Sequence, residues 1–323
     1  MTYAFDMIGY FGKLEPDKVS LNTRKTFSVL AYRHSAPKRD GVDPIKTSDE
    51  SLRYPLESLD VPFEIKQKAE EIVQTQLFTP EYLQNLRKLK LENGVLHFDT
   101  NLVNYGSLPT TRALMQYFPE EQMLPVINQI APMGSIAILV NESDQFFSYA
   151  RRAAKVAVSG RWHGIPGGTY SEGDDIFSNI MREAKEELSK SGREEDSEFE
   201  FGGDNQAYLV GLNRGRYHSL AVGLDFIIYT NWSLNRMWQN LADEHDLIRA
   251  IPLDEKALRV EILDMLFGGT PEGKTYDKLV DHGLGAMLHM GRLHFGNGWY
   301  DQMAKELTDP KVGVRIYENN PFA

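Results

Sequence analysis

Arg182, Glu183, Glu186 and Glu187 lie within six consecutive positions of the chain. In a helix, at about 100° per residue, the three carboxylates share one arc of about 100°. Carboxylates this close repel one another at neutral pH, which lowers stability unless a cation lies among them. A hard divalent cation such as Mg²⁺ binds carboxylate oxygens and keeps waters and substrate phosphates in its shell. The pattern therefore indicates a site for a hard divalent cation, with a solvated amphipathic helix as the alternative for these residues taken alone.

A glycine loop precedes this helix. Gly167 and Gly168 let the backbone approach a ligand closely and offer carbonyl oxygens to a metal. Asp174 or Asp175 can cap a helix that starts near position 176. The apolar side of that helix should face the core through Phe177, Ile180, Ala184 and Leu188. The carboxylates occupy the neighbouring arc.

The segment from Gly168 to Glu187 resembles the Nudix box, G-x5-E-x7-R-E-U-x-E-E-x-G-U, in which U is apolar. The matching positions are Gly168, Arg182, Glu183, Ala184, Glu186 and Glu187, and Trp162 and the run from Ile165 to Gly168 are similar to the family's approach to the box. Two departures stand out. Asp174 replaces the first glutamate, and Ser189 and Lys190 replace the closing glycine and apolar residue. Because the metal-binding core is complete, we expect an active enzyme.

The resemblance covers residues 134 to 262 and implies both a fold and a reaction. The implied fold is α+β, a Nudix α/β/α sandwich with a mixed sheet, preceded here by a smaller α/β N-terminal domain. Nudix enzymes hydrolyse a nucleoside diphosphate linked to another group X, by attack of water on phosphorus. The implied cofactor is Mg²⁺ (or Mn²⁺), which lowers the pKa of a bound water while a carboxylate takes the proton.

The resemblance also assigns roles by position. The implied metal ligands are Glu183, Glu186, Glu187 and the carbonyl of Gly167. The implied catalytic residues are Glu183 and Glu186, with Arg182, which orients the carboxylates. Gly168 and Asp174 have implied structural roles, and Asp174 braces the loop. Glu244, just before a predicted strand, stands where many members of the family keep a further acidic ligand. An ordinary acidic loop explains Glu244 equally well. The catalytic base stays open among the box glutamates and Glu244.

Several residues near the box could contact a substrate. A basic run, Arg151, Arg152, Lys155 and Arg161, could bind phosphates beside the metal, with surface charge as the alternative. His163 could face a ligand from the loop before the box. Tyr149 and Tyr170 could stack on a base, although ordinary packing is the favoured explanation.

The box does not identify the group X. A weaker likeness, carried by Leu96-His97-Phe98, Asn104-Tyr105 and the run from Ser148 to Ala157, is to two-part Nudix enzymes that cleave UDP-glucose and UDP-galactose to UMP and sugar 1-phosphate. ADP-ribose, dinucleotides, coenzyme A and nucleoside triphosphates stay open as substrates. A non-catalytic, nucleotide-sensing Nudix module is the alternative from another class.

Composition narrows the remaining classes. The 323 residues include 46 acidic and 35 basic side chains, a net charge of −11, and no cysteine. The lack of cysteine excludes disulfides and thiolate metal sites, and the negative charge argues against broad nucleic-acid binding. No signal peptide or apolar run long enough for a bilayer is visible. We expect a cytoplasmic protein that binds a small nucleotide and has no nucleic-acid or membrane partner. A homodimer stays open.

The remaining segments must position these residues. We expect an N-terminal α/β domain of unknown role over residues 1–130 and a Nudix domain with C-terminal helices over 131–323. In the first, helices are expected over 63–76, from Thr79-Pro80-Glu81 onward and over 107–117, with a strand over 95–98 and a surface excursion over 36–61. In the second, strands are expected over 135–140, 145–151, 207–213, 219–231 and 247–252, and helices over 254–267 and 276–291.

Overall fold

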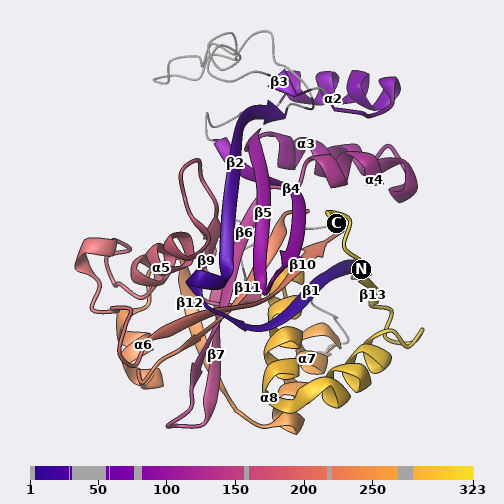
Figure 1. The fold of residues 1–323 in the computed structure, drawn as a ribbon. Helices are drawn as coiled ribbons and strands as arrows, with labels where there is room; N and C mark the ends of the chain where they lie inside the picture. The colour runs from indigo at the N-terminus through magenta and orange to yellow at the C-terminus, as the bar shows by residue number, and fades with distance from the viewer. Residues whose placement is uncertain are drawn as a thin grey trace.

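A computed structural model describes residues 4–28, 30, 56–57, 59–75, 82–155, 160–216, 220–267 and 279–323. These residues form two β-sheets with helices packed around them (Figure 1). The arrangement confirms the expected mixed α+β class. None of the helices in these ranges is long and apolar enough to cross a membrane.

The larger sheet carries the glycine loop. Its strands are β1 (Ala4–Leu14), β6 (Met133–Asn141), β7 (Phe146–Arg152), β8 (Trp162–His163), β9 (Gly167–Thr169), β10 (Gln206–Gly215), β11 (Val222–Tyr229), β12 (His245–Pro252) and β13 (Arg315–Glu318). The main path runs β12-β7-β6-β11-β10-β1-β13, with β8 paired to β7 and β9 paired to β6. The β6–β11 and β1–β13 pairs are parallel and the rest are antiparallel, so the sheet is mixed.

Helices cover both faces of this sheet (Figure 1). They are α7 (Glu255–Phe267) and α8 (Asp281–Leu307) on one face, and α5 (Ile176–Glu187) and α6 (Leu234–Asn240) on the other. Strand β6 shows why both faces are buried, since Ile136 and Ile138 pack into the core with α7 and α8, whereas Ala137 and Leu139 pack into the core with α5. The period of two along a strand sends successive side chains to opposite faces.

The smaller sheet lies on the α5 side of the larger one. Its strands are β2 (Val19–Ser28), β3 (Leu56–Glu57), β4 (Tyr82–Glu92) and β5 (Val95–Asn104), in the order β3-β2-β5-β4, and the helices near it are α2 (Phe63–Thr75), α3 (Ser107–Leu114) and α4 (Glu120–Gln129) (Figure 1). Leu86, Leu89 and Phe98 of this sheet share one apolar core with Ile180 and Ala184 of α5. The smaller sheet is therefore packed directly against the carboxylate helix.

Strand β1 comes early in the sequence but belongs to the larger sheet, between β10 and β13. Its Asp6 is fully buried and accepts ion pairs from Arg214 at 2.8 Å and from Arg216 at 2.7 Å. Arg216 also contacts Glu120 of α4 at 2.9 Å. Residues before the expected boundary at 130 therefore complete the sheet that carries the box.

Most expected elements are present. The expected helices over 63–76, 107–117 and 254–267 correspond to α2, α3 and α7, and the expected strands correspond to β5, β6, β7, β10, β11 and β12. The last expected helix, over 276–291, is α8, which begins at Asp281 and continues to Leu307 with a break in helical geometry at Gly296. Most of the excursion expected over 36–61 lies outside the described residues.

The expected helix from position 79 is wrong in its described part, because residues 82–92 form β4. Residues 79–81 lie outside the described residues. Leu83, Leu86 and Leu89 are three positions apart, a spacing that imitates a helix. In the strand, Leu83 packs into one apolar core, whereas Leu86 and Leu89 pack into another, on one side of the strand because of a register irregularity between Leu86 and Lys88. Tertiary pairing with β5 decides the conformation here.

Candidate active site on helix α5

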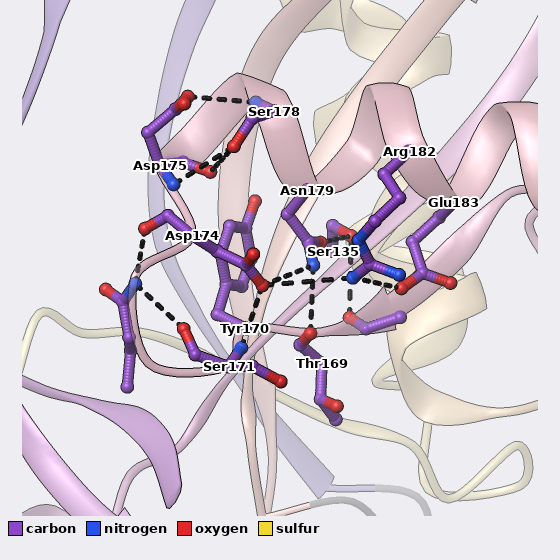
Figure 2. Close-up of polar contacts among 12 residues, drawn as sticks. Ser135, Thr169, Tyr170, Ser171, Asp174, Asp175, Ser178, Asn179, Arg182 and Glu183 are labelled. Carbon is purple, nitrogen blue, oxygen red and sulfur yellow. Dashed lines mark hydrogen bonds and ion pairs between the residues drawn. The ribbon is translucent and has the colours of Figure 1, made fainter. Parts of the chain in front are cut away.

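Helix α5 begins at a well-formed cap. The side chain of Asp175 accepts hydrogen bonds from the backbone N–H groups of Phe177 and Ser178, both at 2.9 Å (Figure 2). In turn, the Asp175 N–H donates to the Ser178 hydroxyl at 3.1 Å. Such a capping box satisfies N–H groups that the helix leaves unpaired. The expected core face is confirmed, since Phe177, Ile180, Ala184 and Leu188 are all buried. This rotation turns the glutamates toward the glycine strand.

Strand β9 brings the glycines beneath those glutamates. Gly167 and Gly168 pair with Ile136 and Ser135 of β6. A side-chain Cβ at Gly168 would lie 2.1 Å from the carboxyl carbon of Glu183, so only glycine leaves room for that carboxylate. The Gly167 N–H points at Glu187 Oε1 from 3.4 Å. The glycine backbone and two of the carboxylates are thus in direct contact.

Arg182 lies between acidic groups on the same helix. Its guanidinium contacts Glu183 Oε1 at 2.8 Å and Glu186 Oε2 at 3.1 Å. Burial raises the pKa of Glu183 to about 7; Arg182 opposes this shift, and the nearby Glu187 and Glu186 add to it. Glu183 is therefore a carboxyl group that can exchange a proton near neutral pH.

Asp174 contacts the loop and helix α5 at shorter range through groups other than Arg182. Its Oδ2 accepts the Ser171 N–H at 2.9 Å and the Asn179 amide at 3.2 Å, whereas Arg182 lies 3.8 Å away (Figure 2). Asn179 also donates to the Thr169 carbonyl at 2.9 Å. The shorter aspartate is thus joined to the helix by Asn179, a buried amide that sequence reasoning did not single out.

Glu187 has a buried histidine as its partner. His245 Nε2 lies 3.0 Å from Glu187 Oε2, and both side chains are buried. The neighbouring Glu244 is exposed, and its backbone carbonyl accepts the Ala153 N–H at 2.8 Å. Glu244 lies in the turn that precedes β12, and His245 is the first residue of that strand. A register irregularity between His245 and Leu247 breaks the alternation there, so periodicity gives no signal for His245.

His163 lies beside His245, with ring centroids 5.2 Å apart. Burial, with His245 and Arg152 nearby, moves the pKa of His163 well below its ordinary value, so the imidazole is neutral at pH 7. Its Nε2 has no hydrogen-bond partner in the described structure. His163 is thus a buried neighbour of the Glu187 and His245 pair.

The basic run before the box meets the acidic turn 243–246. Arg151 forms two hydrogen bonds with Asp246, at 2.8 and 3.1 Å, and Lys155 pairs with Asp243. Arg152 and Arg161 are half-buried and joined through their backbones, since the Arg152 N–H donates to the Arg161 carbonyl at 2.9 Å. The charge of Arg151 is therefore largely matched by Asp246.

The two tyrosines considered for base stacking are core residues. Tyr149 is fully buried and contacts Glu261 through its hydroxyl. Tyr170 is fully buried and donates to the Ile176 carbonyl at 2.8 Å, where α5 begins. Ordinary packing, the favoured explanation, is confirmed for both.

Over the described residues, no three His, Asp or Glu side chains are arranged to hold a metal ion. The box carboxylates instead contact Arg182, the Gly167 N–H and His245. No protein-family model matches the chain, and no curated protein does either.

Proposed function

We propose that this chain is a divalent-metal-dependent pyrophosphohydrolase of the Nudix type, with the Nudix α/β/α sandwich as its catalytic part. It cleaves a nucleoside diphosphate linked to a group X, and UDP-sugars are the first substrates to test. The observation that carries the proposal is the contact between Glu183 and Gly168, in which a carboxylate of α5 occupies the space that a side chain on β9 would fill. A helical charge run on an ordinary surface does not need a glycine at that position.

The donor set fits a hard cation by its chemistry. Mg²⁺ (or Mn²⁺) would be held by carboxylate oxygens of Glu183, Glu186 and Glu187 with the Gly167 carbonyl, all oxygen ligands. Glu244 is a weaker candidate, since its side chain is exposed. When bound, the cation supplies charge for the pyrophosphate and acidity for a coordinated water.

The side chains of the site have separate proposed roles in the reaction. Arg182 holds Glu183 and Glu186 in place through its two ion pairs. A box carboxylate accepts the proton of the attacking water as the new oxygen–phosphorus bond forms and the bridging oxygen leaves with its electron pair. The pKa of about 7 at Glu183 belongs to the metal-free chain and a bound cation would lower it, so the base stays open among the box glutamates and Glu244. Arg151, Arg152 and Arg161 are the basic residues proposed to bind the substrate phosphates, and Arg151 is already paired with Asp246.

A substrate panel tests the proposal. The protein is incubated with UDP-glucose, UDP-galactose, ADP-ribose, NADH, coenzyme A or nucleoside triphosphates, with Mg²⁺, Mn²⁺ or a chelator, and phosphorus NMR identifies the products. We expect metal-dependent cleavage of one class to two phosphomonoesters, or to a monophosphate and pyrophosphate for a triphosphate. No turnover of any substrate with either metal contradicts the proposal.

One observation favours a second candidate, a nucleotide-sensing module without catalysis. The carboxylates are already matched by Arg182 and His245, so they have partners without a cation. A sensor of this kind binds a nucleotide tightly in the presence of a chelator and does not change it. Calorimetry with chelator, run on the same panel, separates the two candidates.

A further inference from the structure

The segment that follows the glycine strand joins the two sheets. Strand β9 pairs with β6 of the larger sheet, and the next residues pair with β4, the edge strand of the smaller sheet. The Gln84 N–H donates to the Tyr170 carbonyl at 2.9 Å, and the Glu172 N–H donates to the Tyr82 carbonyl at 3.1 Å. The loop that leads to α5 therefore pairs with the edge of the smaller sheet as a short added strand.

Gln84 also reaches into this loop with its side chain. It is fully buried, and its Nε2 donates to the Ser171 carbonyl at 3.2 Å and to the Asp174 carbonyl. Its Oε1 accepts from the Thr23 hydroxyl of β2 at 3.4 Å. Since both amide hydrogens are engaged with loop carbonyls, losing them would leave two acceptors without this partner in a part-buried position.

The carboxylate of Asp174 holds the same loop from within. Its carboxylate accepts the Ser171 N–H and the Asn179 amide, and Arg182 lies 3.8 Å away (Figure 2). Because the link to Arg182 is long, contacts from outside the box add to that of Asn179 in fixing the position of the loop. Gln84 supplies two of them from a strand about ninety positions earlier in the chain.

We propose that Gln84 is a positioning residue for this site, and that the smaller sheet serves to hold the loop that places Gly168 beneath Glu183. The link to catalysis rests on the proposed function, whereas the effect on the loop does not. Groups that orient metal ligands without touching the metal typically change metal affinity or activity about 10–100-fold. Gln84 acts one step further away, through the 171–174 loop, so we expect the lower part of that range.

Two substitutions test Gln84, with a neighbour as control. Gln84→Ala removes the side chain, and Gln84→Met removes both donors at similar length. Asn85→Ala is the matched control: Asn85 is equally buried and hydrogen-bonds Asn101, the Gln129 carbonyl and the Ala131 N–H, all outside the loop. The three full-length variants are compared at equal folded fraction, checked by near-ultraviolet circular dichroism.

Three quantities are measured: amide hydrogen exchange at Ser171 and Glu172, Mn²⁺ binding by electron paramagnetic resonance, and kcat, KM and the Mg²⁺ half-saturation of hydrolysis. For both Gln84 variants we expect exchange and the Mn²⁺ dissociation constant to rise about tenfold relative to Asn85→Ala, with kcat falling more than KM rises. Exchange and Mn²⁺ binding equal to those of Asn85→Ala would overturn the proposal. If the wild-type protein neither binds Mn²⁺ nor hydrolyses any substrate, the proposed function fails, and the exchange comparison alone decides the role of Gln84 in the loop.

Discussion

Replacing Gly168 with alanine tests the contact on which the proposed function rests. The added Cβ would lie 2.1 Å from the Glu183 carboxyl carbon and 2.2 and 2.5 Å from its two oxygens. Ordinary van der Waals contact begins at 3.4 Å, so the carboxylate must move by more than 1 Å. Gly168 has no positive φ, so the perturbation is steric and not a backbone strain.

The geometry predicts different effects on stability and on activity. Glu183 can rotate the end of its side chain away, which costs about 0.5–1.5 kcal/mol if it leaves its preferred rotamer. A displacement of about 1 Å in a catalytic constellation can lower the rate about 10²-fold. We therefore expect Gly168→Ala to lower kcat about 10²-fold while the free energy of unfolding falls by no more than about 1.5 kcal/mol.

The assay combines steady-state kinetics over a Mg²⁺ titration with urea unfolding of the same preparation. Gly298→Ala is the control, because a Cβ at Gly298 meets nothing within 4 Å and the residue lies inside α8. That variant should keep wild-type kinetics and be as stable or slightly more stable, since alanine is the better helix former. Wild-type kcat and Mg²⁺ dependence in Gly168→Ala would refute the reasoning.

Three further predictions follow from other contacts. Glu187→Gln keeps the size of the side chain but removes its charge, so kcat at saturating Mg²⁺ should fall at least about 10²-fold; near-normal turnover would remove Glu187 from the site. Asp6→Ala leaves two buried arginines without their shared partner and should lower the urea unfolding free energy by about 3–5 kcal/mol, and a loss under about 1 kcal/mol would contradict that reading of the ion pairs. Burial lowers the pKa of His163 in the folded state, so the unfolded state binds the proton more readily. The contribution of His163 to the free energy of unfolding is therefore fully present above about pH 6.5. It is lost as the pH falls toward the folded pKa, by up to about 1.4 kcal/mol per pH unit. Urea unfolding between pH 7.5 and 5 should show a flatter profile for His163→Gln than for the wild type, and identical slopes would exclude His163 as the source.

The box helix could be predicted because its signals are local. The cap at Asp175 and the buried positions Ile180 and Ala184 all lie within three turns of one helix, where a period of 3.6 residues fixes direction. The same reasoning was wrong for β4, although a local signal for a strand was present. Asn93 and Gly94, with φ of 53° and 76°, form the tight turn between β4 and β5, and an Asn-Gly pair is a strong hairpin signal.

The periodicity of the sequence could not identify the partners of the box residues. His245 meets Glu187 from 58 positions away, and Gln84 meets Asp174 from 90 positions away. Such contacts depend on how β12 and β4 are placed by the two sheets. A single helical wheel can show that carboxylates converge, but it cannot show which side chains from other elements meet them.

These partners change the electrostatic argument for the site. From the sequence, three carboxylates on one arc repel one another and call for a cation. In the fold, Arg182 already joins Glu183 and Glu186, and His245 already contacts Glu187. A metal ion entering the proposed site must therefore displace interactions that stabilise the metal-free chain, and this lowers its net affinity. A phosphate substrate offers Arg182 a new anionic partner, so we expect Mg²⁺ to bind more tightly in the presence of the nucleotide than alone, and the nucleotide to bind more tightly in the presence of Mg²⁺ by the same factor.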